Sequence, residues 1–157
     1  MMIDRHAILA TLDTLLGVPF LHQGRTHAGL DCLGVVMFVA QAHGVPLQDM
    51  QGYAAATDSV LLTQECQRQL IEIPVSEAVP ADLVQWADLT GPLSPPCNLA
   101  FLGWRNGHVT MVHAWLKMGC VCEHDLSRPW PQMVKRAYSL PEIGAWAPIE
   151  GETAGPE

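Results

Sequence analysis

The chain has 157 residues, of which 49% are apolar and 15% charged, a composition that excludes an intrinsically disordered chain and suits one domain with its own core. Its formal net charge is −8, from 16 acidic and 8 basic residues without a basic cluster, which argues against nucleic acid as a partner. No apolar run reaches the roughly 20 residues of a membrane span and the first residues do not resemble a signal peptide, so we expect no membrane insertion.

Three helices are predicted in the first half of the chain. Residues 3–16 place their apolar side chains on one stripe, with Asp4 as N-cap and Gly17 at the end. Residues 31–44 are almost entirely apolar between an N-cap, Asp31, and Gly44, so we expect this helix at the buried centre of the domain. A third, more polar helix is predicted over residues 57–71.

After Pro80 the pattern changes to short strands, which are predicted around residues 82–86, 98–104, 108–115, 119–124 and 135–140. Asn106-Gly107 predicts a tight hairpin turn between the second and third of these strands. Helices followed by a small antiparallel sheet indicate an α+β fold. We expect one domain over residues 1–148 and a flexible tail over residues 149–157.

The five cysteines are an odd number in a chain without a secretion signal, which favours reduced thiols over a disulfide framework. Cys32 is the candidate nucleophile, because it follows the capping residue Asp31 at the start of the central helix. The partial positive charge of a helix N-terminus favours a thiolate and lowers the pKa of a cysteine placed there.

The predicted register of the hairpin indicates which histidine could act together with the Cys32 thiol. A two-residue turn at Asn106-Gly107 pairs Arg105 with His108 and Ala100 with His113, and makes Asn98 a diagonal neighbour of His113 on the same sheet face. Cysteine, histidine and asparagine together are the catalytic set of some cysteine proteases. We therefore expect Cys32 to face the strand that carries His113, with His113 as general base and Asn98 orienting its ring.

The sequence resembles the NlpC-type peptidoglycan cysteine peptidases in HQGRTHAGLDCLGVV, in PADLVQW, and in VHAW followed by VCEHDLSRPW and RAYSLP. The resemblance covers about residues 14–141, and it is greatest to the branch encoded by tailed phages and prophages for their tail tips. It implies a papain-like core, in which a central cysteine-bearing helix packs on an antiparallel sheet. It also implies cleavage of stem peptides of the bacterial cell wall, with the nucleophile at Cys32.

The sequence departs from this family at the position of the general base. The position of the family's histidine base is held by Asn98, and the position of its third, orienting residue is held by His113. Three outcomes follow: His113 acts as base, the site is degenerate and the protein is a structural tail-tip subunit, or His108 is the base in another register. His22 and Gln23 precede the nucleophile and are expected to line the cleft beside Asp31, which we interpret as a cap.

Cys120, Cys122 and His124 alternate along one predicted strand, but they lack the second ligand pair of a structural zinc site, so we expect neither metal nor cofactor. An acidic chain without a wall-binding module is expected to reach the cell wall within a larger particle. The resemblance thus implies peptidoglycan peptides as substrate and other phage tail-tip or hub proteins as partners. It also implies synthesis in the host cytoplasm and a final place in the virion tail.

Overall fold

The computed structural model describes residues 2–54 and 58–149. Its elements in chain order are α1 (Arg5–Leu15), β1 (Arg25–Thr26), β2 (Gly29–Leu30), α2 (Cys32–Ala42), α3 (Ser59–Gln69), β3 (Ile71–Ile73), the 3-10 turn η1 (Val75–Glu77), β4 (Leu83–Trp86), β5 (Asn98–Arg105), β6 (His108–Trp115), β7 (Cys120–Asp125), α4 (Trp130–Met133) and β8 (Val134–Ser139). The predicted α+β fold is confirmed.

Six strands form one antiparallel sheet in the order β3-β8-β4-β5-β6-β7. The turn between β5 and β6 is made by Asn106 and Gly107, whose φ angles of 53° and 79° both lie in the left-handed region that such a turn needs. It pairs Arg105 with His108 and brings Phe101 opposite Val112, which is the predicted register.

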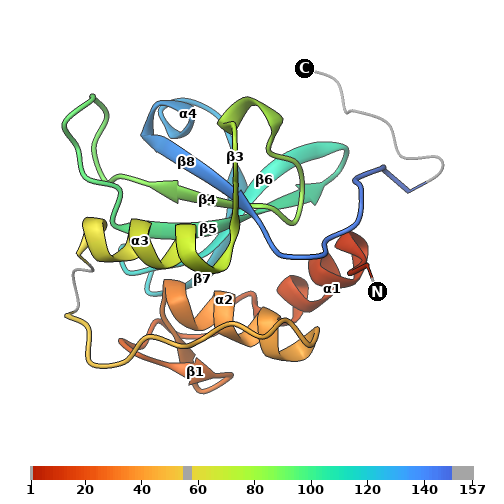
Figure 1. Cartoon of the computed structure of the whole chain (residues 1–157), viewed down its shortest axis with the longest axis horizontal. Helices are drawn as coiled ribbons and strands as arrows, with labels where there is room; N and C mark the ends of the chain where they lie inside the picture. Colours follow the sequence, from red (N-terminus) through yellow and green to blue (C-terminus); the bar gives the residue numbers. More distant parts are fainter. Residues whose placement is uncertain (1, 55–57, 150–157) are drawn as a thin grey trace.

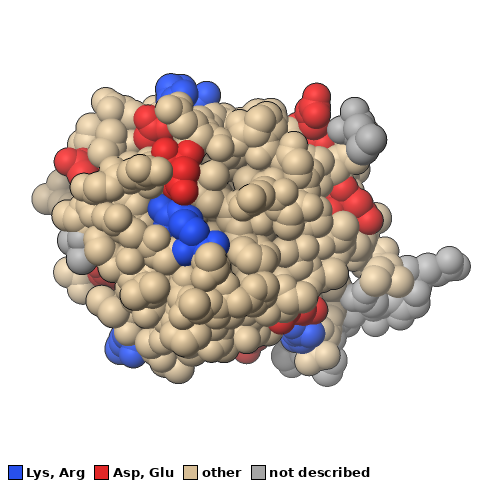
Figure 2. Space-filling view, turned by 90° about the horizontal axis from the view of Figure 1, so that it is seen from below, with Lys and Arg blue, Asp and Glu red and all other residues tan. Residues whose placement is uncertain are grey.

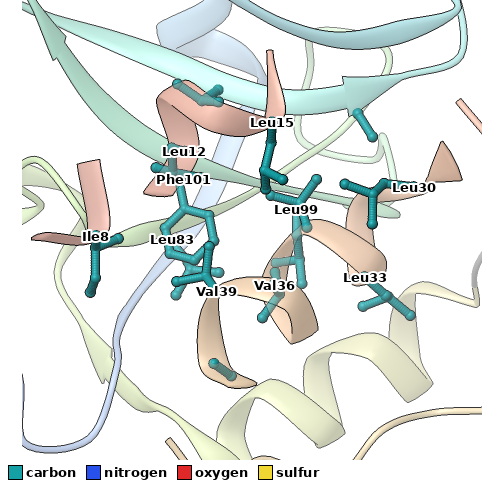
Figure 3. Close-up of a cluster of buried hydrophobic side chains, with 14 of the residues drawn as sticks. Ile8, Leu12, Leu15, Leu30, Leu33, Val36, Val39, Leu83, Leu99 and Phe101 are labelled. Carbon is teal, nitrogen blue, oxygen red and sulfur yellow. The ribbon is translucent and has the colours of Figure 1, made fainter. Parts of the chain in front are cut away.

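The two faces of the sheet carry two separate clusters of buried side chains. Helices α1, α2 and α3 lie against one face and α4 against the other (Figure 1). Figure 3 shows the larger cluster, in which side chains from α1 and α2 meet those from β4 and β5. The smaller cluster, on the α4 face, contains Trp86, Ala100, Met111 and Met133. Alternation along β5 and β6 therefore decides which residues face the central helix.

The predicted helices and strands are all present, with ends that differ by a few residues. The β1–β2 hairpin, β3 and α4 were not predicted, because elements of two to four residues are too short to show a hydrophobic period. The predicted start of the third helix at Thr57 lies outside the described residues, and so does the predicted tail apart from Ile149.

Within residues 2–54 and 58–149, no helix has the length and apolar character needed to cross a lipid bilayer. On the face seen in Figure 2, the basic side chains of the described residues stand singly or beside acidic ones and form no continuous basic patch.

Gly34 is the point at which α2 packs closely against the preceding loop. A Cβ atom there would lie 2.1 Å from the backbone carbonyl oxygen of Gly24. We therefore expect Gly34→Ala to lower the free energy of unfolding by about 1–3 kcal/mol, because helix and loop must move apart. Urea denaturation followed by circular dichroism measures this. Gln41→Ala, at an exposed position of the same helix, should change stability by less than about 0.5 kcal/mol, and equal losses would contradict the close packing.

Candidate active site

Cys32 is the first residue of α2 and opens into a cleft. Asp31 caps the helix by accepting a hydrogen bond from the Gly34 N–H at 2.8 Å, and the backbone N–H groups of Leu99 and Leu33 donate to the Cys32 sulfur. The cleft has a volume of about 230 Å³. Its walls come from the loop before α2, the start of α2, the segment around residue 53, the segment between β4 and β5, the start of β5 and the end of β6. The lining residues are Phe20, His22, Asp31, Cys32, Tyr53, Asp88, Cys97, Asn98, Ala114, Trp115 and Leu116. Cys32 thus lies at the predicted helix start, beside a cavity.

The thiol of Cys32 is held in its neutral form. Burial raises its pKa to about 11, and the neighbouring Asp31 carboxylate also raises it, whereas the Leu99 and Leu33 N–H groups and Arg25 lower it. The expectation of a pKa lowered by the helix terminus is therefore wrong. Desolvation of the thiolate outweighs the hydrogen bonds from the backbone, so this thiol would need a base to act as a nucleophile.

The Asp31 carboxylate is fixed by a network behind Cys32. It accepts hydrogen bonds from Arg25 Nη1 at 3.0 Å, from the Gln23 backbone N–H at 2.7 Å and from the Tyr53 hydroxyl. Arg25 also pairs with Asp49 at 2.9 Å, which ties the segment after α2 to the loop before it. Asp31 is thus a buried, charge-paired cap, in agreement with the interpretation from sequence.

Asn98 lines the cleft at the start of β5. Its Nδ2 donates to Asp88 Oδ1 at 3.2 Å and lies 3.5 Å from the Trp86 carbonyl oxygen. A side-chain amide does not accept a proton near neutral pH. Asn98 can therefore position a substrate or a neighbour but cannot activate the thiol.

His113 does not line the Cys32 cleft. This corrects the prediction that His113 faces Cys32 and acts as its general base. Its strand neighbours Val112 and Ala114 belong to the cluster on the α2 face, so the His113 side chain points to the α4 face. There its ring lies 5.2 Å from that of Trp86, 5.5 Å from that of Trp115 and 5.7 Å from that of Trp130, between ring centroids. The predicted alternation of side chains along β6 is right, but α2 packs on the sheet face opposite to the one that carries the His113 side chain.

His113 and His124 form a hydrogen-bonded pair of imidazoles on the α4 face. His124 Nδ1 is 3.0 Å from the Asp125 carbonyl oxygen, which can only accept, so His124 Nε2 is left to accept from His113 Nε2 at 2.8 Å. Nδ1 of His113 then carries a buried lone pair without a hydrogen-bond partner among the described residues. Burial, and secondarily His124, lowers the pKa of His113 to about 3.

The alternative base, His108, is also remote from Cys32. It is exposed and pairs with Arg105 at the turn end of the hairpin, seven residues along β5 from Asn98, or roughly 24 Å. Of the two loop residues, His22 lines the Cys32 cleft as predicted. Gln23 lies beside it and donates its amide to the Tyr53 carbonyl oxygen at 3.0 Å, but its side chain is exposed on a neighbouring surface pocket with Arg25.

Cys120, Cys122 and His124 share the α4 face of β7, because they pair with Trp115, His113 and Met111. Among the described residues, no group of three or more His, Cys, Asp or Glu side chains is placed to hold a metal ion.

Seven residues of the cleft were not predicted from the sequence, and those with polar or indole side chains are Tyr53, Asp88, Cys97 and Trp115. Tyr53, Asp88 and Cys97 lie in or beside irregular segments, where no periodicity indicates direction. The sequence does place Trp115 at the end of the strand that carries His113. Its position at the cleft depends on how this end of the strand packs against the loop before α2, which the sequence does not indicate.

No protein-family model matches the sequence, and no curated protein matches it. Solved structures do match. A Staphylococcus aureus protein described as similar to lipoprotein, of the NLP/P60 family, has a TM-score of 0.62 at 20% identity over 90% of this chain. The NlpC/p60 domain of the peptidoglycan hydrolase SagA gives 0.61 at 21% identity over 88% of this chain and 100% of that domain. The P60 domain of an antigen from M. avium subspecies paratuberculosis gives 0.59 at 16%, with coverage of 89% and 96%.

This chain spans 42% of the length of the Staphylococcus aureus protein, so it corresponds to one part of that molecule. At these identities the comparison concerns the arrangement of helices and strands. The chain therefore has the fold of an NlpC/P60 domain, with a cysteine at the head of its central helix.

Proposed function

We propose that the protein is a cysteine peptidase of bacterial cell-wall peptides, with Cys32 as its nucleophile. The observation that carries this is the place of the thiol: it stands at the N-terminus of α2, within a cleft, with backbone N–H groups directed at its sulfur. Backbone N–H groups beside a nucleophile are the donors that stabilise the oxyanion of acyl transfer. The likeness to the domain of the peptidoglycan hydrolase SagA supports cell-wall peptides as the substrate class.

The cleft offers both surfaces that an extended peptide requires. Phe20, Trp115 and Leu116 provide apolar wall, while Asn98 and Tyr53 provide groups that can hydrogen-bond to a peptide backbone. A substrate carbonyl carbon above Cys32 would lie between these two walls.

Cleavage of purified stem peptides, followed by mass spectrometry of the products, tests the proposal. Cys32→Ala should abolish cleavage, since no thioester can form. Cys97→Ala removes the other thiol of the same cleft and should retain cleavage. Products formed at the same rate by Cys32→Ala would refute the proposal, and so would equal losses in both variants.

A second candidate is a catalytically degenerate subunit that serves assembly. The raised pKa of Cys32 and the amide at position 98 favour it, because neither supplies a thiolate at neutral pH. If the wild-type protein releases no product while the SagA domain cleaves the same peptides in parallel, this second function replaces the first.

For either candidate we propose association with a phage or prophage tail tip, after synthesis in the host cytoplasm. The support is the sequence resemblance over residues 14–141 together with a net charge of −8, which disfavours independent adsorption to an anionic wall. Purified tail particles should contain the chain in fixed ratio to their tip or hub proteins, and its absence from such particles would contradict the association.

A further inference from the structure

His22 is the histidine that shares the Cys32 cleft. Among the described residues, the other six histidines are engaged elsewhere or lie on other surfaces: His6, His27, His43, His108, His113 and His124. His22 lies in the loop that enters α2, and its side chain is 39% exposed.

The surroundings of His22 give its two ring nitrogens different roles. Nδ1 lies 4.0 Å from Asp31 Oδ2, and the ring meets the Tyr53 ring edge-on at 5.3 Å between centroids. Asp31 is itself held in place by Arg25 and by the Gly34 N–H. The Gln23 side-chain nitrogen, which can only donate, lies 3.4 Å from Nε2, so Nε2 is the unprotonated nitrogen that can accept a proton. The Asp31 carboxylate on the Nδ1 side stabilises the imidazolium that results.

We propose that His22 is the general base for Cys32 and that Asp31 orients it. This rests on the proposed function, in which Cys32 is the nucleophile. The base then comes from the loop before the nucleophile and not from the sheet, where the sequence resemblance places it and where this chain has Asn98. Asp31 thereby serves twice, as helix cap and as partner of the base.

The proton moves through one nitrogen in both half-reactions. His22 Nε2 accepts the Cys32 thiol proton while the sulfur bonds to the substrate carbonyl carbon, and it returns that proton to the amine as the carbon–nitrogen bond breaks. Water then attacks the thioester and gives a proton to Nε2. As the carbon–sulfur bond breaks, that proton restores the thiol and the carboxylic acid product leaves.

The test measures the alkylation rate of Cys32 by iodoacetamide between pH 5 and 10, in a Cys97→Ala background, with the labelled peptide identified by mass spectrometry. With His22 present, the rate should rise in a limb that lies at lower pH than the rise of the unassisted Cys32 thiol, whose pKa burial raises to about 11. His22→Gln should remove this limb and leave only the rise at the pKa of the unassisted thiol. His27→Gln, in the same loop but packed on Phe38, is the matched control and should keep it.

Peptide cleavage by the same variants separates this inference from the proposed function. His22→Gln should slow cleavage by roughly 10²- to 10⁴-fold. Cleavage that depends on Cys32 but persists in His22→Gln would overturn the inference and keep the peptidase. A low-pH alkylation limb that depends on His22, without any cleavage, would keep the base and remove the peptidase. A limb absent from the wild type, or unchanged in His22→Gln, would overturn the inference.

Discussion

Replacing Asp82 by alanine is expected to lower the free energy of unfolding by about 3–5 kcal/mol. Asp82 is buried and forms an ion pair at 2.8 Å with Arg5, the first residue of α1. It also accepts hydrogen bonds from the Ser139 hydroxyl at 2.7 Å and from the Val79 N–H at 2.9 Å. Its loss leaves the Arg5 guanidinium buried without its counter-charge, which costs more than the pair contributes when intact.

Denaturation by guanidinium chloride, followed by circular dichroism, measures this loss. Asp13→Ala is the control, because it removes an ion pair with Arg105 that is about half exposed, and it should cost less than about 1 kcal/mol. Adding Arg5→Met to Asp82→Ala should restore part of the stability, since the unpaired charge is gone. Equal effects of Asp82→Ala and Asp13→Ala would show that the buried pair does not hold α1 to the sheet.

Stability should fall steeply on acidification because of His113. Its pKa is lowered to about 3 in the fold and is about 6.5 in an unfolded chain. Between these values the unfolded chain binds a proton that the folded protein does not, so stability rises with pH through this window. Within this window the contribution of His113 to the free energy of unfolding rises by up to about 1.4 kcal/mol per pH unit. It is fully present above pH 6.5.

The comparison that isolates this effect is His113→Phe against the wild type, by thermal or urea denaturation at several pH values from 4 to 8. Phenylalanine keeps a ring among Trp86, Trp115 and Trp130 but cannot titrate. The stability difference between wild type and variant should therefore change across the window and become constant above pH 6.5. His108→Gln, at the exposed turn, should track the wild type. Parallel curves for His113→Phe and wild type would contradict a depressed pKa.

Local signals in the sequence predict most of the fold. Asp31 and Gly44 bound an apolar run that becomes the central helix, and Asn106-Gly107 determines the register of β5 with β6. These features depend on neighbours along the chain. The short β1–β2 hairpin and β3 depend on tertiary packing instead, and no pattern in the sequence marks them.

The site was predictable only in part, for a related reason. Alternation shows that Asn98 and His113 are on one side of the hairpin, but not which side the central helix covers. That choice is made by the side chains of Leu99, Phe101 and Val112, which pack in the cluster beneath α2. The pKa of Cys32 was likewise not predictable, since it depends on how deeply the helix start is buried.

Trp115 has an optical consequence for the study of this cleft. Its indole lines the cavity beside Cys32, stacks on His113 and lies 5.1 Å from the Trp130 ring and 6.4 Å from the Trp86 ring, between centroids. Three of the five tryptophans are thus within excitation-transfer range of one another, and one of them borders the cavity. A molecule entering the cleft changes the surroundings of that indole, so intrinsic fluorescence and near-ultraviolet circular dichroism report occupancy without any label.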